Sequence, residues 1–248
     1  MTESVQSPAE LSSLDYRLDS YAGLLRSFRD AGYEFGRFED GRPAVGEILL
    51  RHDIDLSLDR ALAMAERERE LGVRSTYCVL LSAPAYDLTR PRNLRLLGRI
   101  ADLGHDLALH FDTHRYWSTT ADPGRAIIEA KVTDELDVLG RLLGDQPSTV
   151  SFHMPPDWVL DRAFEPFANT YAPAFFDDIG YRSDSSQKWR SAAPFGEGLP
   201  DRFQLLVHPG LWHAAHRPMA EIVGDHRRRS HSQVDDYFAP LSEAADEQ

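Results

Sequence analysis

The fold is decided by Glu47-Ile48-Leu49-Leu50-Arg51-His52-Asp53-Ile54-Asp55, an apolar run that ends on a histidine and two aspartates. A short, mostly apolar run of this kind predicts a strand that is buried on both faces. A second stretch, from Gly104 to His114, repeats the arrangement, because Leu107-Ala108-Leu109 runs into closely spaced histidines and aspartates. Parallel α/β sheets and barrels carry their chemistry at the carboxyl ends of their strands. The two stretches therefore predict one metal site that is assembled from two strand ends.

Strand-like and helix-like segments alternate along the rest of the chain. Ser57 is a suitable N-cap for one helix, and Gly72 follows the end of that helix. The expected helices cover residues 14–31, 58–71, 93–103 and 122–143. The expected strands cover residues 47–51, 75–81, 107–110, 149–152 and 203–207, with a less regular one over 180–183. Alternation of this kind predicts an α/β fold with a parallel sheet or barrel.

The domain organisation follows from this pattern. Residues 1–13 are polar and are expected to form a flexible lead-in, and residues 14–217 are expected to form one barrel domain. Residues 218–248 form a charged C-terminal tail, in which Arg227-Arg228-Arg229 is expected to lie in solvent.

Composition excludes several classes of protein. The net charge of −13 disfavours a nucleic-acid partner or an anionic membrane surface. The one cysteine, Cys78, excludes an internal disulfide and a thiolate-rich zinc site, and it is expected in the core. No run approaches the ~20 apolar residues of a membrane helix. The first residues lack the pattern of a secretory signal, so we expect a cytoplasmic protein with a small-molecule partner. The oligomeric state stays open.

Four of the ten histidines fall at the downstream ends of expected strands: His52, His110, His153 and His208. These ends share one side of a parallel sheet, which favours a shared site. His105 precedes a strand, at the opposite end, and is expected to be structural. The histidines of the C-terminal region are expected at the surface: His213, His216, His226 and His231.

The spacing of the candidate residues favours metal chemistry. His110 and His114 are four apart, the spacing that places two imidazoles on one face of a helical turn. With one carboxylate from Asp53 or Asp55 they make a set that fits Zn²⁺, and also Fe²⁺, Co²⁺, Ni²⁺ or Mn²⁺. The second carboxylate of that pair suits a base that takes a proton from metal-bound water. Asp112 is a candidate for orienting an imidazole.

Later residues extend the predicted site. His208 ends a strand and suits an acid that protonates a leaving amine, because an imidazole titrates near neutral pH. His153 precedes two prolines and forms either a pocket wall or part of the core. Three further residues, Asp184, Trp189 and Trp212, either line the cleft, where aromatic faces would stack on sugar rings, or belong to the core.

These motifs, taken in order, resemble the polysaccharide deacetylase superfamily, the NodB-homology carbohydrate esterases of family 4 type, and within it the intracellular polysaccharide deacetylase-like branch. The resemblance runs from about residue 47 to residue 212. It rests on five motifs: His52-Asp53-Ile54-Asp55, Gly104-His105 through His114, Phe152-His153-Met154-Pro155-Pro156, Tyr181-Arg182-Ser183-Asp184 to Trp189, and Leu206-Val207-His208-Pro209 to Trp212.

The resemblance implies a distorted (β/α)7 barrel with one divalent metal ion. It implies Asp55, His110 and His114 as ligands, Asp53 as the base and His208 as the acid. The implied reaction removes an N-acetyl group, or a related acyl group, from an amino sugar or another carbohydrate-containing molecule. Some relatives open other linear or cyclic amides.

The chain departs from the family pattern at two motifs. The family's first motif has adjacent carboxylates, whereas Ile54 separates the two here, so the roles of Asp53 and Asp55 are open to exchange. The family's Arg-Pro-Pro segment, whose arginine tunes the base, appears as His153-Met154-Pro155-Pro156, which leaves His153, Arg51 or Arg182 for that role. Without an export signal, the expected substrate is a soluble intermediate rather than a cell-wall polymer.

Two other functions remain as alternatives. One is a member of the deacetylase fold that binds a ligand without catalysis. The other is a non-haem Fe²⁺ oxygenase, because His110-Phe111-Asp112 fits a His-x-Asp half-triad. Oxygenases of that kind are usually all-β proteins, and the strand–helix alternation argues against this alternative.

Overall fold

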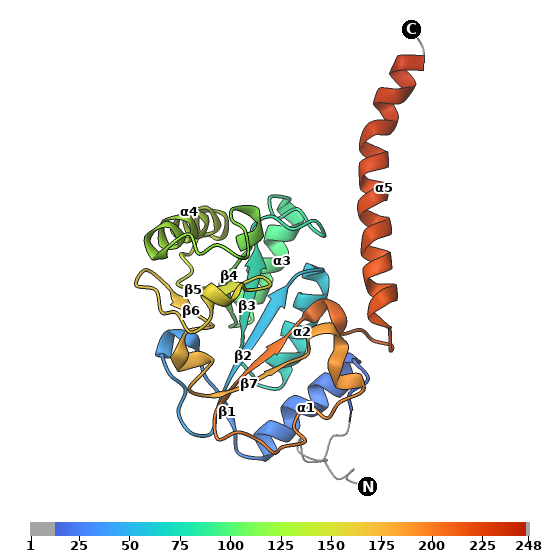
Figure 1. The fold of residues 1–248 in the computed structure, drawn as a ribbon. Coiled ribbons are helices and arrows are strands. Elements are labelled where there is room, and N and C mark those ends of the chain that lie inside the picture. Colours follow the sequence, from blue (N-terminus) through green and yellow to red (C-terminus); the bar gives the residue numbers. More distant parts are fainter. Residues whose placement is uncertain (1–12, 247–248) are drawn as a thin grey trace.

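A computed structural model describes residues 13–246, and the side chains up to residue 240 (Figure 1). The five helices of this range are α1 Leu18–Asp30, α2 Leu58–Glu70, α3 Pro91–Asp102, α4 Arg125–Leu143 and α5 Met219–Asp246. The strands are β1 Glu34–Phe35, β2 Glu47–Ile54, β3 Thr76–Leu80, β4 Asp106–Phe111, β5 Thr149–Phe152, β6 Ala168–Asn169, β7 Gly180–Ser183 and β8 Phe203–Val207. Short 3-10 turns are η2 Phe38–Asp40, η3 Thr113–Arg115, η4 Asp157–Val159, η5 Pro173–Phe175, η6 Ser185–Arg190 and η7 Pro209–Leu211.

The strands form one parallel sheet with the order β6-β5-β4-β3-β2-β8-β7, and β1 pairs with the start of β2. The strand that contains the fold-deciding stretch, β2, therefore lies at the centre. Because every pair is parallel, all the strands end on one side of the sheet, and the loops that follow them meet there.

The sheet curls into a half-barrel, so residues of its middle strands reach the segment that follows edge strand β6. Gln204 of β8 donates a hydrogen bond to the carbonyl oxygen of Thr170, and Arg51 of β2 donates one to the hydroxyl of Tyr171. The structure confirms the predicted fold class, an α/β fold of the distorted-barrel type. The sheet remains open between its edge strands β6 and β7.

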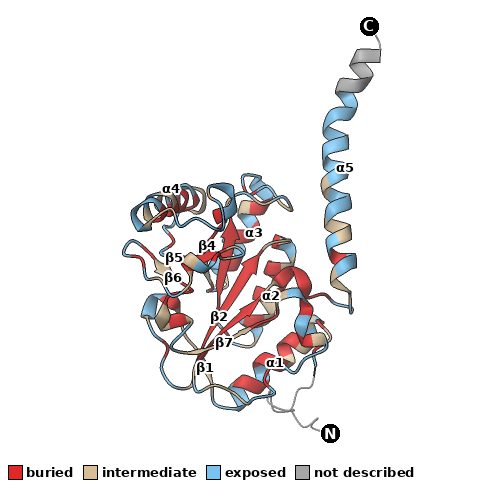
Figure 2. Cartoon of the chain, in the orientation of Figure 1, coloured by how far each residue is buried: buried red, intermediate tan, exposed pale blue. Residues whose placement is uncertain are grey.

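The helices bury the outer face of the sheet. Figure 2 shows the central strands of the sheet and the inward sides of α1 and α2 as buried. Side chains from α2, α3 and α4 pack with β3, β4 and β5 in one cluster, and side chains from α1 pack with β2 and β8 in another. Cys78 lies in β3 and is fully buried, as predicted.

The predicted elements are present, with shifts at their ends. The helix expected from residue 14 begins at Leu18, and the one expected from residue 122 begins at Arg125. Ser57 caps α2 by accepting a hydrogen bond from the backbone N–H of Arg60. Two strands were not predicted, β1 and β6, because two residues are too few to show a period. Residues 1–12 of the expected lead-in lie outside the described residues.

The C-terminal tail is helical in the structure. Helix α5 extends away from the sheet over most of its length (Figure 1), and Arg227, Arg228 and Arg229 are exposed, as expected. Its first turns approach the site, because Ser230 donates a hydrogen bond to the carbonyl oxygen of Pro84. Among the described residues, no helix combines the length and apolar character that crossing a bilayer requires.

Candidate metal centre

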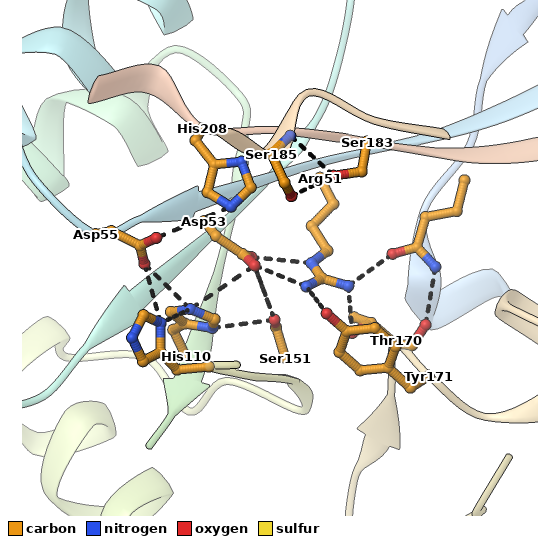
Figure 3. Close-up of polar contacts among 12 residues, drawn as sticks. Arg51, Asp53, Asp55, His110, Ser151, Thr170, Tyr171, Ser183, Ser185 and His208 are labelled. Carbon is orange, nitrogen blue, oxygen red and sulfur yellow. Dashed lines mark hydrogen bonds and ion pairs between the residues drawn. The ribbon is translucent and has the colours of Figure 1, made fainter. Parts of the chain in front are cut away.

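Five ionisable side chains meet where four strands of the half-barrel end (Figure 3). Asp53 and Asp55 come from the end of β2, and because side chains alternate along a strand, both point to the inner face. His110 comes from β4, and His153 and His208 follow β5 and β8 directly. The structure thus brings together three of the four strand-end histidines that the sequence singled out, along with Asp53 and Asp55. His52 points to the outer face, where its Nε2 lies 2.7 Å from Glu68.

Three of these side chains offer their ligand atoms to one point. Asp55 Oδ1 lies 3.2 Å from His110 Nε2 and 3.3 Å from His153 Nδ1, and the two nitrogens are 3.1 Å apart. Asp55 Oδ1 is buried and makes no hydrogen bond. Among the described residues, this trio is the one group of three ligand side chains whose donor atoms all lie within 4.8 Å of one another.

The hydrogen bonds around His110 fix its tautomer. Ser151 Oγ donates to Asp53 Oδ1 at 3.2 Å, so it accepts a hydrogen bond from His110 Nδ1 at 3.0 Å. The lone pair of His110 therefore lies on Nε2, which faces Asp55. A fixed tautomer of this kind is typical of metal-binding histidines. Ser151 was not predicted, and the signal that would have revealed it is a lone polar residue in an apolar strand.

A buried arginine holds Asp53. Arg51 has no exposed surface, and its Nε and Nη2 donate to the two carboxylate oxygens of Asp53 at 2.9 and 2.7 Å. Burial raises the pKa of Asp53, but the charge and hydrogen bonds of Arg51 outweigh it and hold that pKa well below its usual range. Asp53 is therefore ionised at neutral pH. Of the three residues that the sequence left for pairing with the base, the structure places Arg51 in contact with Asp53.

Polar groups from distant segments satisfy the remaining donors of Arg51. Its Nη1 donates to Thr170 Oγ1 and Gln204 Oε1, each at 2.9 Å, and its Nη2 donates to the hydroxyl of Tyr171 at 2.8 Å. Buried charges need such partners, because an unpaired one is costly. Sequence reasoning missed this set, since its members lie more than a hundred residues from Arg51.

A second carboxylate holds His208. Asp184 is fully buried, and its Oδ1 lies 2.6 Å from His208 Nδ1. Burial lowers the pKa of His208, but the charges of Asp184 and Asp55 outweigh it and raise that pKa to about 9. His208 Nε2 lies 3.9 Å from Asp55 Oδ2. His208 is therefore protonated at neutral pH and faces the same site.

His114 lies outside the trio. Its side chain is exposed, and its Nδ1 lies 3.2 Å from Asp112 Oδ1, in the turn η3. Asp112 thus contacts an imidazole, as predicted, but this imidazole is not grouped with Asp55. The third member of the trio in the structure is His153, whereas the resemblance implied His114 as the third ligand. The i, i+4 spacing does not group His114 with His110 in this structure, because the chain after β4 forms a 3-10 turn rather than an α-helix.

The structure decides among the alternatives left open for the two tryptophans and for Arg182, and it corrects the expectation for His213. Trp189 and Trp212 are buried in the core with α1 and line neither pocket described below, so neither offers a face to a sugar. Trp212 instead donates from Nε1 to Asp184 Oδ2 at 2.8 Å. Arg182 donates to the carbonyl oxygen of Tyr181 rather than to Asp53. His213, expected at the surface, is buried, with its Nε2 3.2 Å from the carbonyl oxygen of Gly210.

Two pockets open onto the site. The larger has a volume of about 510 Å³ and lies toward α5, and the smaller, of about 360 Å³, lies toward β7. Asp53, Asp55, His153 and His208 line both. A site with two adjoining pockets suits a substrate whose two parts extend in different directions from the reacting bond.

No protein-family model and no curated protein matches this chain. Solved structures of similar fold include a family 4 acetyl xylan esterase from Clostridium thermocellum in complex with a cobalt ion, with 16% identity and a TM-score of 0.43 over 77% of this chain and 90% of the other. A Streptococcus pyogenes deacetylase in complex with acetate has 14% identity and a TM-score of 0.41 over 82% and 85%. A CE4 family pseudoenzyme from Bacillus anthracis has 11% identity and a TM-score of 0.43 over 73% and 60%.

Proposed function

We propose that this protein is a metal-dependent hydrolase that removes an acyl group from the nitrogen of a small molecule, such as an acetamido sugar. The observation that carries the proposal is the trio of Asp55, His110 and His153, flanked by Asp53, which is paired with Arg51, and by His208, which is paired with Asp184. Metal-dependent amide hydrolysis needs a metal site, a base and an acid, and these five side chains supply them.

The trio fits a divalent cation. Two imidazole nitrogens and one carboxylate oxygen form a set that Zn²⁺ accepts in catalytic sites, with further positions left for water and substrate. Co²⁺, Ni²⁺, Mn²⁺ and Fe²⁺ accept the same donors. A cation would also satisfy the buried Oδ1 of Asp55, which has no hydrogen-bond partner. When bound, the ion supplies a Lewis acid that polarises the amide carbonyl.

The other residues divide the proton transfers. Asp53 is ionised and held by Arg51, so it accepts the proton of the attacking water. His208 is protonated and held by Asp184, so it donates a proton to the leaving nitrogen. Two groups whose pKa values are pushed apart in this way are the usual mark of an acid and a base in one site. Because Asp55 belongs to the trio and Asp53 does not, Asp53 is assigned as the base.

The oxygenase alternative has less support. It needs the carboxylate of Asp112 beside His110, but Asp112 contacts His114. The fold is also α/β rather than all-β.

The test measures acyl release from N-acetylglucosamine and other acetamido sugars by protein loaded with Zn²⁺ or Co²⁺, before and after removal of the metal with a chelator. We expect turnover that the chelator abolishes and that added metal restores. Asp53→Asn should bind metal as the wild type does and lose about 100-fold or more of kcat, since general base catalysis contributes that much. Full activity of Asp53→Asn would contradict the assignment, and turnover that resists the chelator would contradict the metal mechanism.

A further inference from the structure

Beyond the reacting groups, the larger pocket is mostly apolar. Asp53, Asp55, His153 and His208 lie on one side of it. Ser185 and Ser186 also line it, and the apolar walls come from Leu56, Pro84, Ala85, Leu211, Met219 and Val223. These apolar residues belong to the loops that follow β2 and β3, to η7, and to the first turns of α5.

Apolar side chains of this pocket remain in contact with solvent. Met154 is 68% exposed and Val223 is 43% exposed, although both adjoin a site with several charged groups. Met154 also has φ +44°, a backbone conformation that side chains other than glycine seldom adopt and that is concentrated at functional sites. Apolar surface that lines a cavity beside reacting groups is the usual composition of a ligand site.

The smaller pocket has a mixed lining. Apolar residues such as Phe152, Leu160 and Phe176 form much of its wall, and Ser183 and Lys188 add a hydroxyl group and a cation. The site thus lies between two largely apolar pockets, of which the smaller also carries polar groups. A methyl group would fill little of a cavity of about 510 Å³.

We infer that the substrate of this site carries an apolar group much larger than a methyl group next to the amide, and that this group binds in the pocket closed by α5. The inference rests on the proposed hydrolase for the position of the amide, and on the pocket residues for the apolar group. The smaller pocket then receives the other side of the amide. Helix α5 contributes to specificity through Met219 and Val223.

Binding of neutral amides tests the pocket without turnover. Acetamide, butanamide and octanamide are titrated into the full chain, with and without Zn²⁺, by isothermal calorimetry. Each methylene that is buried tightens binding by up to about fourfold, so octanamide should bind at least about tenfold more tightly than butanamide. Equal affinities for all three amides would overturn the inference.

A matched pair of variants on α5 locates the effect. Val223→Asp places a charge in the pocket and should remove most of the preference for octanamide. Val234→Asp lies further along the same helix, where Val234 is 56% exposed and belongs to neither pocket, and it should keep the preference. Equal behaviour of the two variants would overturn the assignment to this pocket.

A turnover series separates this inference from the proposed function and shows which side of the amide is apolar. N-octanoylglucosamine is compared with N-acetylglucosamine and with N-octylacetamide. Faster cleavage of the octanoyl sugar places the chain on the acyl side, and faster cleavage of the octyl amide places it on the amine side.

Tight octanamide binding without turnover of any amide supports the pocket and contradicts the hydrolase. If the rate of turnover does not depend on the length of the apolar chain, the result supports the proposed hydrolase and contradicts the inferred role of the pocket.

Discussion

Arg51 and Asp53 lie two residues apart on β2 and form a buried, two-pronged ion pair at 2.9 and 2.7 Å. The pair exists because alternate side chains of a strand share a face, and here that face is the inside of the half-barrel. A base held in this way keeps one orientation toward the metal trio. Arg51 also stabilises the fold, because its guanidinium neutralises the buried carboxylate of Asp53.

We expect Arg51→Met to lower the free energy of unfolding by about 3–5 kcal/mol, because removing one partner of a buried ion pair leaves a charge without compensation. Arg182→Met is the matched control. Arg182 is half-buried on β7 and donates only to a backbone carbonyl, so its loss should cost less than about 1 kcal/mol. Urea denaturation of both variants measures the difference. Equal losses would contradict the structural role of the Arg51–Asp53 pair.

His208→Ala should reduce kcat by about 100- to 10,000-fold, the range that a general acid contributes. Asp184→Asn should reduce kcat by a smaller factor, because the imidazole remains but loses the carboxylate that orients it. Metal content should stay at the wild-type level in both, since neither residue belongs to the trio. Steady-state kinetics beside elemental analysis tests this. Loss of metal in His208→Ala would instead make His208 a ligand.

A buried cluster behind the sheet predicts how stability depends on pH. Glu68 is fully buried and contacts His52 at 2.7 Å and Ser75 at 2.6 Å. Burial raises the pKa of Glu68, but the charge of His52 and its hydrogen bond to Glu68 outweigh it and leave that pKa below 4.5. Burial lowers the pKa of His105 below 6.5. Both groups favour their deprotonated forms in the folded state.

Stability from His105 is therefore complete above pH 6.5 and is lost as the pH falls below it, and stability from Glu68 is lost below pH 4.5. Glu68→Gln should lower the free energy of unfolding at pH 7 by about 3 kcal/mol and flatten its decline in acid. Glu66→Gln, on the same helix, removes a partly exposed ion pair with Arg99 and should cost at most about 1 kcal/mol. Denaturation at pH 7, 5.5 and 4 gives these values. If the free energy of unfolding of Glu68→Gln falls between pH 7 and pH 4 as steeply as that of the wild type, the role given to Glu68 is contradicted.

The sequence predicted the parts of this fold that depend on local pattern. The apolar runs before Asp53 and His110 indicated buried strands, and the Ser57 cap marked the start of α2. Two-residue strands left no such pattern. The sequence also predicted which residues of the site lie at the ends of strands. Parallel strands all end on one side of a sheet, so their terminal residues were expected to lie close together.

The remainder depends on three-dimensional contacts. The spacing of His110 and His114 suggested a shared face, yet the turn after β4 directs His114 to Asp112. His153 follows the neighbouring strand β5 and reaches Asp55 across the sheet, a contact that no spacing in the chain reveals. The tryptophans were ambiguous for a similar reason, since an aromatic side chain gives the same signal in a core and in a cleft.

Metal content tests the central claim most directly. The wild-type chain, His153→Ala and His114→Ala are purified without added metal, dialysed against Zn²⁺ and analysed for bound metal. We predict one equivalent in the wild type, a large loss in His153→Ala, and retention in His114→Ala, because the trio consists of Asp55, His110 and His153. Retention in His153→Ala with loss in His114→Ala would contradict the assignment of ligands, and a wild type that takes up no metal would contradict the metal centre itself.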